Sequence, residues 1–232
     1  MSRGRSRGRG ISNVTASPVA SQGGSSAAAC FQTYYDGVDD YFTSSDASLK
    51  AAGQYTIAGE VDFDSISAND TIWGARVPAG GMNIYMSSNG AMNFIVTDSG
   101  ANSIPVTSVG AFTTGAGFQT FVCVVNATTA SIYVDGSLDG TGAASLTSGS
   151  GATSATPHLC TAHDATSRVF HGSLRNFTIR SGATSTPTAW IPTDPTSLVG
   201  TTALLYLPKG NDENDDGISF TKFGDPITSA CP

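Results

Sequence analysis

Apolar and polar residues alternate in short runs along this chain, and turn-forming residues separate one run from the next. The clearest case is 31–42, where two alternating runs flank Asp36-Gly37, a pair suited to a tight hairpin turn because glycine takes a positive φ at low cost. No stretch of about eleven residues or more shows the apolar period of a helix, so we expect few and short helices. Alternation of this kind predicts an all-β protein, and the 39% apolar content is enough to fill a sandwich of two antiparallel sheets.

Several blocks, taken in order, resemble strands of laminin-G-like domains, the concanavalin-A-like jelly rolls found in lectins, glucanases and many phage surface proteins. The first is Asp-Gly-x-Asp-Asp-Tyr at 36–41, which is similar to the first hairpin of that family. The later blocks are 55–63, 118–125, 131–136, 170–179 and 204–207. The resemblance covers roughly residues 31 to 223, and it implies a laminin-G-like jelly-roll domain over 30–232, preceded by an extended arm at 1–29.

The arm and the body carry opposite charge. Arg3, Arg5, Arg7 and Arg9 alternate with glycine and serine, while the rest of the chain holds 7 basic and 18 acidic residues, a net charge of −11. The arm has few large apolar side chains, so it cannot offset the entropy of ordering by itself. We expect these arginines to anchor the arm on an acidic protein surface of a larger assembly; the alternative is that the arm packs on its own domain. Nucleic acid is disfavoured, because no aromatic residue accompanies the arginines and the acidic body repels phosphates.

Four cysteines are far apart in the sequence, which excludes a local zinc knuckle. In a jelly roll the two chain ends commonly lie close together, so the resemblance implies a Cys30–Cys231 disulfide, which leaves Cys123 and Cys160 as a second pair. Closing a loop of about 200 residues would stabilise the fold by about 5 kcal/mol. The alternative is four reduced thiols that serve as small core residues.

Catalytic chemistry has weak support in the sequence. Glu60, Asp62 and Asp64 are similar to part of the Glu-x-Asp-x-x-Glu strand of laminarinase-type glycosidases, but the second glutamate is absent. A retaining glycosidase needs two carboxyl groups about 5 Å apart. We expect these carboxylates to face outward and to be solvated, and we expect surface positions for His158, His163 and His171. The prediction is a protein that is not an enzyme and has no catalytic residues.

The acidic loop 212–217 is a candidate calcium site. Asp212, Asn214 and Asp216 occupy positions 1, 3 and 5 of a calcium-loop pattern and glycine follows at position 6. Phe223 stands at position 12, where the bidentate glutamate belongs, so a complete EF-hand is excluded. The open alternatives are a weaker Ca²⁺ site and a solvated turn. No cofactor is required by any motif.

These observations lead to a functional hypothesis. The first residues lack the apolar region of a signal peptide, and no segment approaches the roughly 18 apolar residues that span a bilayer, so we expect no membrane insertion. We predict a non-enzymatic virion structural protein, a capsid decoration (cement) or fibre protein that is anchored by its arm to capsid or other virion proteins and lies on the virion surface. The alternative is an extracellular lectin module that binds cell-surface glycans in adhesion, with or without calcium. In either case we expect a homo-oligomer, with a trimer as the first guess.

Overall fold

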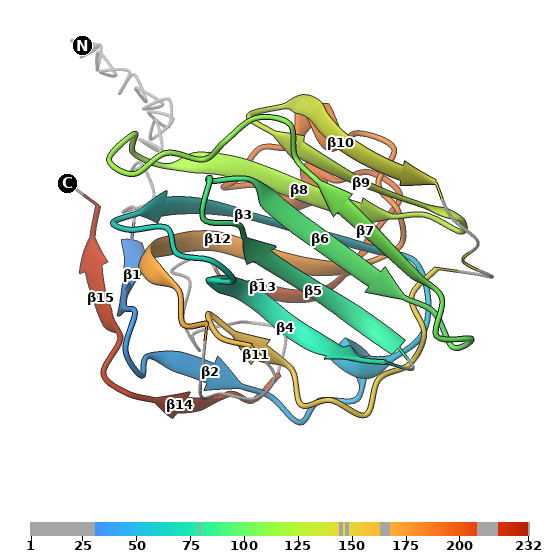
Figure 1. Cartoon of the computed structure of the whole chain (residues 1–232), viewed down its shortest axis with the longest axis horizontal. Helices are drawn as coiled ribbons and strands as arrows, with labels where there is room; N and C mark the ends of the chain where they lie inside the picture. The colour runs from blue at the N-terminus through green and yellow to red at the C-terminus, as the bar shows by residue number, and fades with distance from the viewer. Residues whose placement is uncertain are drawn as a thin grey trace, which may run out of the picture.

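The computed structural model describes residues 31–78, 80–143, 146, 149–162, 168–207 and 218–231, and these residues form two antiparallel sheets packed face to face (Figure 1). Sheet A contains β1 (Phe31–Asp36), β3 (Tyr55–Phe63), β8 (Gln119–Val125), β9 (Thr129–Val134), β10 (Ser137–Ala143), β12 (His171–Ser181), β13 (Thr202–Leu207) and β15 (Ile227–Ala230). Sheet B contains β2 (Tyr41–Thr43), β4 (Thr71–Val77), β5 (Gly80–Met86), β6 (Met92–Thr97), β7 (Ser103–Thr107), β11 (His158–Leu159) and β14 (Thr221–Phe223). The helices found in this part of the chain are three short 3₁₀ turns: η1 (Ser48–Lys50), η2 (Pro187–Ala189) and η3 (Pro195–Ser197).

The strand order mixes neighbours that are distant in sequence. Sheet A runs β10-β9-β8-β3-β12-β1-β15, with β13 also paired to β12, and sheet B runs β14-β2-β11-β4-β5-β6-β7. This arrangement confirms the predicted all-β sandwich. None of the helices in the described ranges is long and apolar enough to cross a membrane.

The core lies between the sheets and follows the alternation seen in the sequence. On β3 the residues Ile57, Val61 and Phe63 are almost completely buried and point inward. Phe63 meets Phe170 edge-to-face at 5.2 Å between ring centroids, and Trp73 of β4 lies 6.0 Å from the ring of a phenylalanine on β12. One continuous apolar cluster therefore joins both sheets.

Local turn chemistry was predicted correctly where the turn is short. The block at 131–136, which resembles a family strand followed by a turn, forms a tight hairpin between β9 and β10, in which Asp135 and Gly136 both have positive φ, of 46° and 74°. Positive φ at both central residues is the type I′ geometry that matches the twist of paired strands.

The predicted hairpin at 31–42 is wrong. β1 pairs with β12 and β15 in sheet A, whereas β2 pairs with β11 and β14 in sheet B. Gly37 does take the expected positive φ of 76°, but the turn sends the chain from one sheet to the other. Tyr35 and Phe42 on its two sides both enter the core, where their rings meet edge-to-face at 6.1 Å.

The second predicted disulfide is also wrong. Cys123 and Cys160 are free thiols with no exposed surface, and burial raises the pKa of both. Cys123 lies on β8 of sheet A, while Cys160 directly follows β11 of sheet B, so the two belong to opposite layers of the core. Cys231 is disulfide-bonded, and Cys30, the partner that the resemblance implies, lies outside the described residues.

Candidate functional site at the rim of the sandwich

Three connecting loops meet at one rim of the sandwich: 64–70 after β3, 87–91 after β5 and 108–118 after β7. They enclose a shallow, open pocket of about 320 Å³. Its lining consists of Ile66, Ser88, Asn89, Gly90, Phe112, Thr113 and Thr114.

Backbone hydrogen bonds fix the shape of this rim pocket. The Phe112 N–H donates to the Gly90 carbonyl at 2.8 Å, and the Gly90 N–H donates to the Ser87 carbonyl at 2.9 Å. Gly90 has φ of 82°, and a Cβ at this position would lie 2.4 Å from the Phe112 carbonyl oxygen. Phe112 itself is buried and meets Phe63 edge-to-face at 5.9 Å. These backbone hydrogen bonds and the packing of Phe112 in the core therefore fix the shape of the pocket.

The pocket presents polar groups to solvent. Four exposed polar residues line it: Ser88, Asn89, Thr113 and Thr114. The hydroxyls of Ser88, Thr113 and Thr114 make no hydrogen bond within the described part of the chain. The Asn89 Oδ1 accepts from the Ala91 N–H at 3.2 Å, which leaves its Nδ2 directed to solvent. Hydroxyl and amide groups of this kind both donate and accept hydrogen bonds, as a polyhydroxyl ligand requires.

A polar cluster around His171 lies next to the pocket, because Ser65 directly precedes Ile66. The His171 Nδ1 lies 2.9 Å from the Ser65 Oγ, and its Nε2 lies 2.9 Å from the Tyr34 Oη and 3.8 Å from an Asp64 carboxylate oxygen. Burial raises the pKa of the Tyr34 phenol, and its hydrogen bond to Asp64 raises it further. The predicted surface position is correct for His171, which is about one-third exposed, but His158 is buried and His163 lies outside the described residues.

Acidic groups gather beside this cluster. Asp36, Asp39 and Asp40 place carboxylate oxygens within 4.8 Å of one another, so they could share a cation. Asp40 is buried and accepts from the Asp36 N–H at 2.9 Å and from the Asp225 N–H at 2.6 Å. Burial raises the pKa of the Asp40 carboxyl, and these two amide hydrogen bonds oppose the rise. The hydrogen bond from Asp225 ties the 36–40 turn to the C-terminal segment, which explains why Asp40 is buried.

The motif at 36–41 was identified as a turn but not as a cation site, although its three aspartates within five residues were a visible signal. The predicted calcium residues Asp212, Asn214 and Asp216 and the arm residues Arg3, Arg5, Arg7 and Arg9 lie outside the described residues. Their predicted roles therefore stay predictions.

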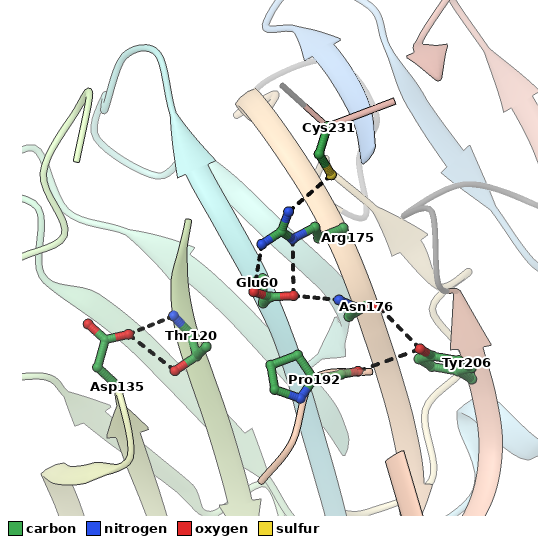
Figure 2. A network of polar contacts seen from close by, with 8 residues as sticks. All are labelled: Glu60, Thr120, Asp135, Arg175, Asn176, Pro192, Tyr206 and Cys231. Atoms are coloured by element: carbon green, nitrogen blue, oxygen red, sulfur yellow. Dashed lines mark hydrogen bonds and ion pairs between the residues drawn. The ribbon is translucent and has the colours of Figure 1, made fainter. Parts of the chain in front are cut away.

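The glutamate that sequence reasoning considered for catalysis lies in a separate network on the outer face of sheet A (Figure 2). The Arg175 Nε and Nη2 donate to the two carboxylate oxygens of Glu60, each at 3.1 Å. The Asn176 Nδ2 also donates to Glu60, and the Tyr206 hydroxyl donates to the Asn176 Oδ1 at 3.1 Å. The Arg175 guanidinium lies 3.8 Å above the Phe118 ring, and its Nη1 lies 3.0 Å from the Cys231 sulfur.

A β-bulge explains how two neighbouring residues reach Glu60 together. The register of β12 against β3 shifts between Arg175 and Thr178, and Asn176 has φ of 50°. The extra residue turns the side chains of Arg175 and Asn176 toward the same face, while Phe177 enters the core. Asparagine tolerates the left-handed region better than most residues.

The expectation of solvated carboxylates is wrong for Glu60, which is 7% exposed, and correct for Asp64, which is exposed. Asp62 between them is half-buried, and burial followed by the nearby Asp64 charge raises the pKa of its carboxyl. Both oxygens of Glu60 are engaged by Arg175, so Glu60 does not present a nucleophile or a general acid to a substrate.

The fold and the rim together define the class of protein: a two-sheet jelly-roll sandwich whose connecting loops form a pocket lined by both polar and apolar side chains. A laminin-G family model, described as the concanavalin A-like lectin/glucanases superfamily, matches residues 36–189, and the chain belongs to this superfamily. No curated protein sequence matches the chain.

Solved structures agree on the fold at low sequence identity. A heptameric SAP-like pentraxin from Limulus polyphemus matches with a TM-score of 0.59 and 13% identity, over 87% of this chain and 95% of the pentraxin. A putative carbohydrate binding protein from Bacteroides ovatus matches with a TM-score of 0.62 and 12% identity, over 87% of this chain and 60% of that protein. Domains LG4-5 of the mouse laminin α1 chain match with a TM-score of 0.52 and 18% identity, over 84% of this chain and 46% of theirs.

Proposed function

We propose that this protein is a non-catalytic carbohydrate-binding module whose glycan site is the rim pocket. The observation that carries the proposal is the preformed pocket, in which Ser88, Thr113 and Thr114 offer hydroxyls with no protein partner among the described residues. A sugar hydroxyl can replace the water at each of these groups, and the fixed backbone adds little ordering cost to binding.

Two further facts support this function. The superfamily of the chain includes lectins by its description, and one similar structure is titled a putative carbohydrate binding protein. The volume of the pocket, about 320 Å³, suits one or two sugar units. The Glu60 carboxylate is occupied by an arginine, which favours binding over hydrolysis.

A glycan array with the full chain tests the proposal, and one matched pair of variants makes the test specific. Thr114→Trp fills the pocket mouth, whereas Thr128→Trp places the same side chain on an exposed threonine past the other end of β8. We expect Thr114→Trp to weaken binding to the selected glycan at least about tenfold, equivalent to about 1.4 kcal/mol, while Thr128→Trp binds like the wild type. Equal binding by both variants would place the glycan site elsewhere or remove it.

Calcium dependence is a separate part of the proposal. The predicted loop at Asp212, Asn214 and Asp216 and the acidic turn at Asp36 and Asp39 both offer carboxylates to a cation. Repeating the array in EDTA, and then with Ca²⁺ restored, decides whether binding needs the metal. Binding that EDTA leaves unchanged assigns no role to calcium at the glycan site.

The virion role remains a second proposal, which rests on the charge of the arm. Arg3, Arg5, Arg7 and Arg9 precede a body with a net charge of −11, so the arm is suited to an acidic partner. Co-sedimentation of full-length and 1–29-deleted protein with particles from its source tests this anchor. Stoichiometric binding that needs the arm supports decoration of a capsid, and arm-independent binding competed by free sugar supports the lectin role alone.

A further inference from the structure

The outer face of sheet B carries a single charged side chain. Among the residues of β4, β5, β6 and β7, Arg76 is the only one with a charge. Figure 1 shows this face of the four strands turned toward the viewer, and the described chain leaves it uncovered over β5 and β6. Because the whole chain has a net charge of −7, a lone cation on this face marks a place where an anion is attracted.

Two hydrogen bonds hold the Arg76 guanidinium across the sheet. Its Nε donates to the Thr97 Oγ1 at 2.7 Å, and its Nη2 donates to the Ser103 Oγ at 3.3 Å. The side chain crosses β5 at Gly81, which is the cross-strand partner of both Arg76 and Thr97. Gly81 has φ of 97°, a region that favours glycine, so no side chain stands in the path of the arginine. The guanidinium therefore has a fixed position on this face.

The partners of Arg76 are neutral hydroxyls. Within the described ranges Arg76 makes no ion pair, and its Nη1 makes no hydrogen bond. Arg175 on sheet A is different, because its Nε and Nη2 both donate to the carboxylate of Glu60. A guanidinium has five N–H donors and forms its strongest contacts with a planar carboxylate. On sheet B, the carboxylate for Arg76 would come from a ligand.

Two more polar side chains on this face lack a protein partner. Asn83 and Tyr85 alternate along β5 with the buried Met82 and Ile84, so they point to the outer face. The Asn83 Oδ1 is shielded from solvent and has no hydrogen-bond partner. The Asn83 Nδ2 and the Tyr85 hydroxyl also make no hydrogen bond within the described part of the chain. Because the terminal torsion of asparagine is broad, the Asn83 amide can turn to accept from and donate to a ligand.

The polar side chains form a row along β5. Gly81, Asn83 and Tyr85 are successive outward positions, about 6.8 Å apart. Arg76 lies at the level of Gly81, so the row from Arg76 to Tyr85 is about 14 Å long. Ile95, the cross-strand partner of Asn83, is half-buried and adds an apolar surface in the middle of the row. The row therefore fits a ligand with a carboxylate at one end and with hydroxyls and C–H surface along its length.

We propose that the outer face of sheet B binds a hexuronic acid oligosaccharide, with one carboxylate on Arg76 and hydroxyls of the next sugars on Asn83 and Tyr85. Each hexuronic acid unit carries a carboxylate for a guanidinium, hydroxyls that donate and accept, and a C–H face that packs on an apolar side chain. An acidic peptide would supply the charge without the hydroxyls. The inference does not depend on the glycan site at the rim pocket, because that pocket is lined by other residues, none of them charged.

Matched ligands test the role of charge on the wild-type chain. Trigalacturonic acid and its methyl ester share the same sugar rings and differ in charge, and triglutamate carries carboxylates without sugar hydroxyls. Titrations followed by ¹H–¹⁵N NMR measure the Kd and locate the ligand from the amides that shift. At pH 7 we expect the acid to bind at least about tenfold more tightly than the ester or triglutamate, equivalent to about 1.4 kcal/mol, with shifts centred on residues 76–85. No binding of the acid, equal binding of either comparison ligand, or shifts confined to the rim loops would overturn the proposal.

Variants test the residue that carries the charge. Arg76→Gln removes it, and Arg168→Gln makes the same change on an exposed arginine outside sheet B. We expect Arg76→Gln to lose at least about tenfold in affinity for the acid and to bind acid and ester alike, while Arg168→Gln binds like the wild type. Arg76→Lys keeps the charge without the planar fork and should lie between them. Thr114→Trp, which fills the rim pocket, should bind the acid like the wild type. If Arg76→Gln still preferred the acid over the ester, or if Thr114→Trp lost binding of the acid, the site would not be on sheet B.

Discussion

The Glu60–Arg175 ion pair gives the sharpest test of how sheet A is held together. Glu60→Gln keeps the shape of the side chain but removes the charge that the Arg175 guanidinium faces. It also turns an amide N–H₂ group toward either the arginine donors or the Asn176 donor. The side chains of Arg175 and Glu60 are only 19% and 10% exposed, so water replaces the lost contact poorly. Removing one partner of a buried pair costs about 3–5 kcal/mol, and the partial exposure here favours about 3 kcal/mol.

Urea unfolding measures this loss of unfolding free energy, and thermal unfolding reports it as a decrease in Tm. For a domain of this size, about 3 kcal/mol lowers the Tm by roughly 6–12 °C. The matched control is Asp135→Asn, the same carboxylate-to-amide change on an exposed residue of the turn between β9 and β10, whose Oδ1 accepts from the Thr120 N–H at 2.8 Å (Figure 2). We expect the control to lose less than about 1 kcal/mol.

A double variant separates a lost contact from an unpaired charge. Glu60→Leu with Arg175→Met removes both charges, and we expect it to be more stable than Glu60→Gln, because a buried pair can often be replaced by apolar side chains at little cost. If Glu60→Gln lost less than about 1 kcal/mol, or if the double variant were the least stable of the three, the argument that an unpaired charge dominates would be refuted.

Three further predictions follow from the rim, the acidic turn and the core. Gly90→Ala should lower the free energy of unfolding by about 2 kcal/mol and weaken glycan binding, because a Cβ would lie 2.4 Å from the Phe112 carbonyl oxygen at a φ of 82°. Urea unfolding and the glycan array measure the two effects, and a variant unchanged in both would contradict the rigid pocket. Burial raises the folded-state pKa of Asp40 above its unfolded value, so the folded state binds that proton more tightly. The wild type should therefore gain stability relative to Asp40→Asn as pH falls from 7 through the raised pKa. A stability difference that stays constant between pH 7 and 4 would contradict this sign. Cys123 and Cys160 should resist alkylation by a maleimide in the native protein and react at two sites after unfolding without reductant, as mass spectrometry would show, whereas no reaction after unfolding would mean that they are paired.

The sequence was sufficient for features that depend on residues close together in the chain. The block 55–63, which resembles a core strand of laminin-G-like domains, coincides with β3. The block 131–136, which resembles a strand followed by a turn in the same family, forms the end of β9 and a tight turn in which both Asp135 and Gly136 have positive φ. The class of fold follows from repeating these local signals along the chain.

The local sequence pattern could not predict side-chain environments that depend on contacts with residues far away in the chain. Glu60 was expected to be a solvated carboxylate because Glu60, Asp62 and Asp64 alternate onto one face of the strand. The bulge at Asn176 on β12 places both Arg175 and Asn176 against it. The same limit applies to the second disulfide, because nothing near Cys123 or Cys160 in sequence shows that they belong to opposite sheets.

The amino-acid sequence by itself determined that this chain is an all-β sandwich with a basic arm and an acidic body, because alternation, turn residues and charge are local properties. Only the tertiary structure decided that 31–42 crosses between sheets, that Glu60 is buried in an ion pair, and that three loops from distant positions meet in a pocket at the rim. The physical reason is that strand pairing joins residues more than a hundred positions apart, and the free energy of such contacts depends on the partner, which no local pattern specifies.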